Sequence, residues 1–141
     1  MLKATYSINE VSRMTGLTTR TIRNYLSDGI ATASKIDGKW VFSQKEFIAM
    51  LDNPYIVPAI KAKNYAPVFD FLKEDKKSDS ELCLVIDRCI GDSDFEPLIS
   101  KICELMNDVK NVEFRFEKKG NNIRIIFAGD EEQVRKIYGE I

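Results

Sequence analysis

The stretch that decides the fold of this chain is Thr18–Ser27, which reads Thr-Thr-Arg-Thr-Ile-Arg-Asn-Tyr-Leu-Ser. At 3.6 residues per turn, a helix over this stretch gathers its polar side chains on one arc of roughly 140°. The stretch contains no carboxylate that would repel phosphate. One side of the predicted helix is therefore buried, and the other offers partners for phosphate oxygens and base edges. The polar arc holds Thr19, Arg20, Arg23, Asn24 and Ser27, and the apolar side holds Ile22, Tyr25 and Leu26.

A second helix is predicted immediately before this one. The segment Ser7-Ile8-Asn9-Glu10 has the spacing of a capping box, in which Ser and Glu side chains satisfy free backbone N–H groups. Gly16 supplies the left-handed residue that ends a helix, and Thr18 is a favourable N-cap for the next one. Two helices joined by such a short turn form a helix-turn-helix.

A β-hairpin and a third helix are predicted next. The pair Asp37-Gly38 is a strong two-residue hairpin turn between the extended segments 33–36 and 39–42. The segment Ser43–Glu46 repeats the capping-box spacing and starts a helix that ends before Pro54. A helix-turn-helix followed by a hairpin and a helix describes a winged helix.

These residues resemble the N-terminal domain of the MerR family of bacterial transcription regulators. The likeness lies in Tyr6–Gly16, Thr19–Tyr25 and Asp28–Ile30, and it covers about residues 5–52. An Arg-Thr-Leu-Arg-Tyr-Tyr segment opens the family's recognition helix, and Arg20–Tyr25 reads Arg-Thr-Ile-Arg-Asn-Tyr here. The resemblance implies a DNA-binding transcription regulator that works as a dimer.

The predicted wing departs from that family. MerR proteins typically carry Gly-Tyr-Arg-x-Tyr, whereas Gly38–Phe42 reads Gly-Lys-Trp-Val-Phe and looks more like an excisionase-type wing. MerR proteins also usually dimerise through a long helix after the DNA-binding domain. Here Pro54, Pro58 and Pro67 interrupt that region, so we expect helix from Pro58 to Tyr65 and again from Pro67 to Glu74, and a different dimer contact.

The predicted contacts with double-stranded DNA follow from the donor groups of the second helix and the wing. Arginine pairs bidentately with guanine or clamps phosphate, and asparagine pairs with adenine. Threonine donates to phosphate oxygens or contacts a thymine methyl group, and lysine reaches the flanking DNA backbone. Tyr25 is shared between packing and a phosphate contact, and Trp40 either anchors the wing on the helices or lies against a sugar. The predicted DNA-binding residues are Thr18, Thr19, Arg20, Thr21, Arg23, Asn24, Tyr25, Lys35, Lys39 and Trp40.

We expect an α+β protein in three parts: a winged helix-turn-helix at 1–57, a helical connection or linker at 58–77, and a second domain at 78–141. The second domain reads as β-α-β-β-α, an incomplete ferredoxin-like arrangement that lacks one terminal strand. The missing strand leaves a sheet edge that invites pairing with a second chain. We therefore predict a homodimer, with the full chain dimeric and residues 1–57 alone monomeric.

A small-molecule effector is the other possible role of the second domain. The loop Arg88–Ser93 can hold a small ligand or serve as a plain connection. Three nearby carboxylates can recruit a hard cation or remain solvated, and we predict neither a metal site nor a cofactor. They belong to Asp87, Asp92 and Asp94.

Composition narrows the functional classes. Residues 1–77 hold 12 Lys and Arg against 8 Asp and Glu, whereas residues 78–141 hold 9 against 14, which suggests separate roles for the two halves. The 141 residues include no histidine, which removes the Ser-His and Cys-His catalytic arrangements. No apolar run of about 18 residues and no signal peptide are visible, so we expect a cytoplasmic protein that is not an enzyme.

The sequence thus favours a sequence-specific transcription regulator. Three alternatives stay open: an excisionase-like factor that bends DNA for a recombinase, an adaptor that kept the fold without binding DNA, and an enzyme with its chemistry in the acidic half.

Overall fold

The computed structural model describes residues 5–75, 77 and 79–141. Residues 1–4, in the predicted first domain, Lys76, in the predicted linker, and Ser78, at the start of the predicted second domain, lie outside the described residues. The elements in chain order are β1 (Thr5–Ser7), α1 (Ile8–Thr15), α2 (Thr19–Ser27), β2 (Ser34–Ile36), β3 (Lys39–Ser43), α3 (Gln44–Leu51), α4 (Val57–Lys73), β4 (Glu81–Cys89), α5 (Asp92–Asn107), β5 (Val112–Lys119), β6 (Asn122–Asp130) and α6 (Glu131–Glu140).

Local capping positions the first three helices as the sequence predicts. The Ser7 hydroxyl accepts from Glu10 N, and the Glu10 carboxylate accepts from Ser7 N. Ser43 and Glu46 repeat this pair at the start of α3. Gly16 ends α1 with a φ of 78°, a left-handed conformation that suits glycine. The predicted helix-turn-helix is confirmed.

The wing belongs to a small antiparallel sheet of order β1-β3-β2. Asp37 and Gly38 have φ values of 52° and 78°, and positive values at both central residues are those of the predicted tight turn. Strand β1 was not expected from the sequence. Its three residues are too few to show an alternating pattern, and pairing with β3 defines it.

The predicted break in the connection is wrong, because α4 runs without interruption through Pro67. Pro58 lies in the first helical turn, where its missing N–H group costs little. Pro67 is buried on the same face as Ile60 and Asn64, and this face packs toward α1 and the C-terminal sheet. Tertiary packing holds the helix together across a proline that disfavours it locally.

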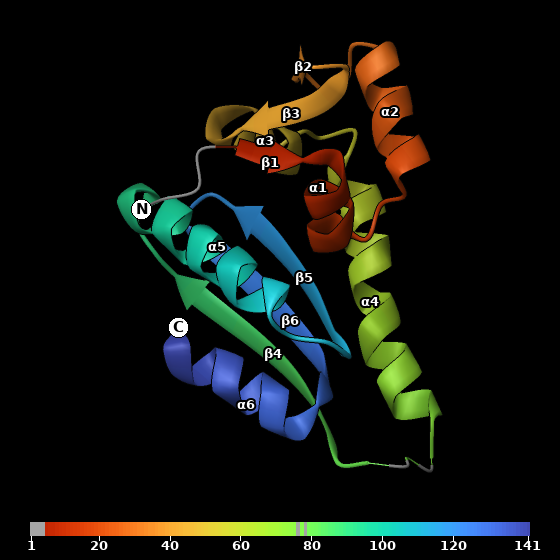
Figure 1. Cartoon of the computed structure of the whole chain (residues 1–141), viewed down its shortest axis with the longest axis vertical. Helices are drawn as coiled ribbons and strands as arrows, with labels where there is room; N and C mark the ends of the chain where they lie inside the picture. The colour runs from red at the N-terminus through yellow and green to blue at the C-terminus, as the bar shows by residue number, and fades with distance from the viewer. Residues whose placement is uncertain (1–4, 76, 78) are drawn as a thin grey trace.

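The C-terminal part has the predicted element order β-α-β-β-α. Its antiparallel sheet has the order β4-β6-β5, with α5 and α6 on one face (Figure 1). Side chains of β5 and β6 that point toward these helices form the core, including Phe114, Phe116, Ile125 and Phe127. Gly129 in β6 allows a close approach, since an added Cβ would lie 2.0 Å from the Asn111 carbonyl oxygen.

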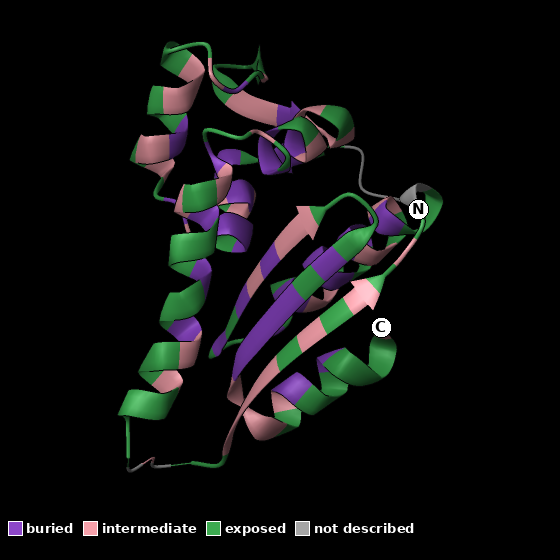
Figure 2. Ribbon diagram, turned by 180° about the vertical axis from the view of Figure 1, so that it is seen from behind, coloured by how far each residue is buried: buried purple, intermediate pink, exposed green. Residues whose placement is uncertain are grey.

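One hydrophobic core joins the N-terminal and C-terminal parts, which the sequence did not indicate. The Phe47 ring of α3 lies 5.8 Å from the Phe116 ring of β5. Met14 Sδ of α1 lies 3.4 Å from Cys103 Sγ of α5. Figure 2 shows buried residues on both sides of this contact. The winged helix is therefore packed directly onto the C-terminal sheet domain.

Two arginines reinforce this junction at helix C-termini, where a positive charge is favoured. The Arg13 guanidinium donates to the Met106 carbonyl at the end of α5, at 3.1 Å. The Arg115 guanidinium donates to the Arg13 carbonyl at the end of α1, also at 3.1 Å. Burial lowers the pKa of Arg115, and its Nε has no hydrogen-bond partner.

Candidate nucleic-acid interface

Helix α2 presents a polar face and buries an apolar one, as the sequence predicts. Thr18 caps the helix, since its hydroxyl accepts from Thr21 N at 3.1 Å. The Ile22 side chain is fully buried, and Tyr25 and Leu26 pack against the core. On the opposite side Arg20, Arg23, Asn24 and Ser27 are exposed, and Thr19 is half-buried.

The two arginines of α2 are available to a ligand. No ion pair involves Arg20 or Arg23 within the part of the chain that the structure describes. Among the described residues, the Arg23 guanidinium donates only to the Thr19 hydroxyl, at 3.3 Å. The first turn of α2 holds no acidic residue. The positive charge of this face is therefore not neutralised by neighbouring carboxylates.

Tyr25 lies at the border of the exposed face. Its ring packs edge-to-face on Tyr55, with the ring centres 6.2 Å apart. Burial, and then the neighbouring Tyr55, raise the pKa of the Tyr25 hydroxyl. This packing fixes the ring against the turn that precedes α4 while one side of Tyr25 remains accessible.

The wing places two lysines near the same end of the molecule. Lys35 and Lys39 are exposed on β2 and β3. The Lys35 ammonium group lies 4.9 Å from the centre of the Trp40 ring, a cation–π distance. Trp40 is half-buried and packs against the core, as expected of an anchor for the wing.

Ile36 is a residue of the wing that the sequence did not single out as a site. Its side chain is 55% exposed beside the Asp37-Gly38 turn. An isoleucine in a predicted strand is normally assigned to the core, so only the structure identifies it as a surface group at the wing tip.

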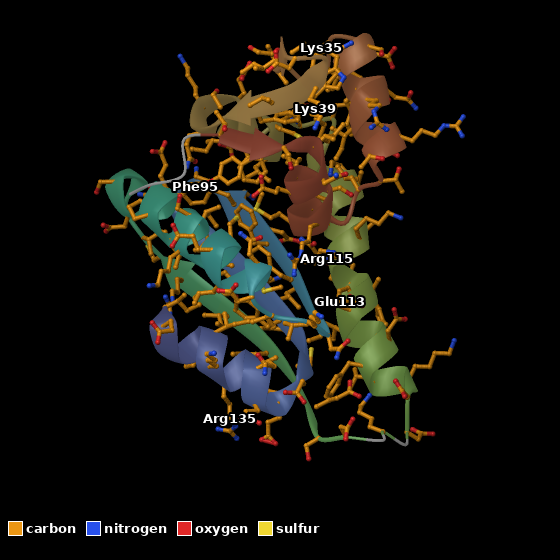
Figure 3. The ribbon with its side chains drawn as sticks, viewed as in Figure 1. Lys35, Lys39, Phe95, Glu113, Arg115 and Arg135 are labelled. Carbon is orange, nitrogen blue, oxygen red and sulfur yellow. The ribbon has the colours of Figure 1, made fainter. Side chains whose placement is uncertain are left out.

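The structure brings the predicted site residues together at one end of the long axis. Helix α2 and the wing lie side by side there, and α6 lies at the other end (Figure 1). Figure 3 shows Lys35 and Lys39 at the first end and Arg135 at the opposite end. The interface thus combines a cationic helix face with a basic hairpin.

The comparisons with known proteins agree with this geometry. Residues 5–54 match the family model of the helix-turn-helix domain. This match covers α1, α2, the wing and α3, and it supports a DNA-binding helix-turn-helix domain in this part of the chain. Comparisons of the chain with curated proteins and with solved structures gave no match.

The cysteines and carboxylates of the C-terminal domain do not form a recognisable site among the described residues. Cys103 is buried, Cys83 is half-buried with a raised thiol pKa, and Cys89 is exposed. Among the described residues no three His, Cys, Asp or Glu side chains group closely enough to hold a metal ion. The side chain of Asp92 is not among those described. Nor does any described helix combine the length and hydropathy needed to cross a bilayer.

Proposed function

We propose that this protein is a sequence-specific, double-stranded DNA-binding transcription regulator of the MerR-like type, acting in the cytoplasm without catalytic activity. The main support for this proposal is the exposed cationic face of α2, which no neighbouring carboxylate among the described residues neutralises and which lies beside a basic wing. A helix of this kind lies in the major groove with its N-terminal residues on base edges. Arg20, Arg23 and Asn24 read bases, and the threonines hold phosphate oxygens.

Selection of the full chain on random duplex DNA, at two salt concentrations, tests this proposal. A regulator should enrich one defined site, with an affinity that falls as salt rises because bound lysines and arginines release counterions. Enrichment of no site, together with no salt-dependent binding, would leave the adaptor as the better description.

The excisionase-like alternative rests on the wing sequence. Gly38–Phe42 lacks the wing arginine of the MerR pattern and presents Lys39 and the half-buried Trp40 instead. An architectural factor of this kind would protect an attachment site and bend it, whereas a regulator would protect a promoter. Footprinting on genomic DNA of the source organism, with gel mobility as a measure of bending, distinguishes the regulator from the architectural factor.

We further propose that the chain binds DNA as a homodimer, because one helix-turn-helix makes few contacts. The sequence predicts a dimer contact at a free edge of the C-terminal sheet, and among the described residues β4 pairs only with β6. The described part of the chain also presents an exposed apolar stripe on α4. Tyr65, Phe69 and Leu72 are 56%, 66% and 67% exposed at successive turns.

The stripe on α4 is suited to a two-fold contact, in which the same patch serves both subunits. An antiparallel pair of α4 helices centred on Pro67 sets Tyr65 against Phe69 of the partner subunit. The same axis sets the small Ala62 against Leu72 of the partner subunit. A large side chain thus meets a smaller one at each end, and we propose this stripe as the dimer contact.

A further inference from the structure

A cleft of about 510 Å³ lies between the winged helix and the C-terminal sheet. One wall comes from the end of α3 and the first turns of α4, and the other from the end of β5, the start of β6 and Asp87 of β4. The loop Arg88–Ser93, considered as a ligand loop from sequence, does not line it. We propose that this cleft binds a small organic anion with an apolar body and thereby regulates DNA affinity, an inference that rests on the proposed function.

The inner surface of the cleft is apolar. Its accessible apolar surface comes from Pro54, Val57 and Pro58, and the nearly buried side chains of Leu51, Ile60 and Ile123 form the floor beneath them. The volume lies within the range of about 300–1,000 Å³ typical of sites for small ligands. These surfaces accept the hydrocarbon part of a ligand.

The carboxylates that line the cleft are already engaged. The Asp87 carboxylate accepts two hydrogen bonds from the Arg124 guanidinium, at 2.7 and 2.9 Å. This pairing lowers the pKa of Asp87 and keeps it ionised. Asp52 lies 3.6 Å from the Lys118 ammonium group, and Glu117 accepts from the Asn64 amide at 3.0 Å.

Two cations of the cleft remain without a partner. Lys61 and Lys119 are exposed, and neither forms an ion pair with any side chain in the described ranges. The first turn of α4 also lines the cleft through Val57 and Pro58, so the positive end of the helix dipole lies close by. An anionic head group, either a carboxylate or a phosphate, is the charge that complements this arrangement.

One wall of the cleft belongs to the winged helix and the other to the C-terminal sheet, so a bound ligand can change the position of one relative to the other. The Asp52–Lys118 ion pair already connects the end of α3 to β5 across the cleft. Ser43 is both the last residue of β3 and the N-cap of α3, so a shift of α3 is passed directly to the wing. A ligand that binds one arrangement of the walls more tightly changes DNA affinity, and DNA changes ligand affinity by the same factor.

Binding is tested on the full chain with decanoate and decyl phosphate below their micellar concentrations and with decanol below its solubility limit, by calorimetry and methyl NMR. At least one of the two anions should bind about tenfold or more tightly than decanol, and the Leu51, Ile60 and Ile123 methyl signals should shift. The carboxylate and phosphate arms identify the preferred head group. The proposed site would be ruled out by equal binding of decanol, by no binding, or by shifts confined to other methyl groups.

The variant Lys119→Gln is the specific test of the head-group contact, with Lys110→Gln as an exposed control outside the cleft. We expect Lys119→Gln to weaken binding of the anion by about fivefold or more, to leave decanol binding unchanged, and to leave thermal stability unaltered. An unchanged anion affinity would contradict the assignment.

Regulation is tested by measuring DNA affinity with and without the bound anion. The anion should change DNA affinity by about fivefold or more in the native chain, and much less in Lys119→Gln. Anion binding with no effect on DNA would overturn the regulatory part. Absence of DNA binding in the ligand-free protein and in the anion-bound protein alike would count against the proposed function instead.

Discussion

At the scale of single residues, the guanidinium groups of α2 carry the proposed recognition. Both are exposed and unpaired with acids among the described residues, whereas Arg115 is half-buried and its guanidinium donates to backbone carbonyls. The residue type alone does not separate these roles. The surroundings do, since a group that binds a ligand has to leave its donors free.

Replacing Arg20 or Arg23 with alanine should weaken binding to the selected DNA site by about 1–3 kcal/mol where the arginine reads a base. An arginine that contacts only phosphate should instead lower the salt slope by about one and weaken all sequences alike. Fluorescence anisotropy at several salt concentrations measures both quantities. Arg135→Ala, at the opposite end of the molecule, is the control and should change neither.

Tyr6 gives the protein a pH-dependent stability. Burial, and then the neighbouring Cys103, raise the pKa of its hydroxyl from 10.0 to about 12. Between these values the unfolded chain releases the proton while the folded chain keeps it. The free energy of unfolding is therefore fully retained below pH 10 and falls as the pH rises to about 12, by on the order of 2 kcal/mol.

Denaturant unfolding of the native chain and of Tyr6→Phe, at a series of alkaline pH values, checks this. The variant loses the hydroxyl that accepts from the Gln44 amide, so we expect it to be slightly less stable at neutral pH. It should also lose less stability than the native chain between pH 10 and 12. Parallel pH curves for the two proteins would assign the loss to other groups.

At the scale of elements, α4 differs from the sequence-based prediction, which divided it into two helices. Pro67 predicts a break because it removes an N–H group and crowds the preceding turn. The helix persists because Ile60, Asn64 and Pro67 are buried along one face against neighbours that are distant in sequence. Because α4 is one continuous helix, Tyr65, Phe69 and Leu72 form an exposed stripe along its opposite face. Two separate helices would not align these side chains.

Phe69→Glu should convert the full chain from dimer to monomer, because it places a charge in the centre of the proposed contact between α4 helices. Light scattering after gel filtration measures the mass, and Tyr138→Glu on α6 is the control at a similarly exposed aromatic residue. If Phe69→Glu remains dimeric, the edge of β4 becomes the better candidate.

At the scale of the whole molecule, the shared core makes the winged helix and the C-terminal sheet one unit in stability. Phe116 lies in β5, yet its ring contacts Phe47 of α3 as well as Phe95 of α5. A fragment that ends at residue 57 would expose Met14 and Phe47, which are 2% and 0% exposed in the full chain. Dimerisation is therefore tested with full-length variants, in which this core stays intact.

Phe116→Ala should therefore destabilise the wing together with the sheet, by about 3–5 kcal/mol. Trp40 is the only tryptophan of the chain, and its fluorescence reports on the wing. We expect thermal transitions followed by Trp40 fluorescence and by circular dichroism to shift together to lower temperature. A Trp40 transition that stays in place would show that the winged helix is stable without the sheet.

The sequence by itself determined the features set by neighbouring residues. The caps at Ser7, Thr18 and Ser43, the turn at Asp37-Gly38, the two faces of α2 and the β-α-β-β-α order all follow from local hydrogen bonding and hydrophobic periodicity. The exposed position of Arg20 and Arg23 also follows, because Ile22 fixes which side of the helix is buried.

Only the tertiary structure decided the rest. The common core, the continuity of α4, the contacts of Arg13 and Arg115 and the cleft near Lys119 join segments that are far apart along the chain. Such contacts depend on how complete elements pack, and a local pattern does not encode which distant surface an apolar face will meet.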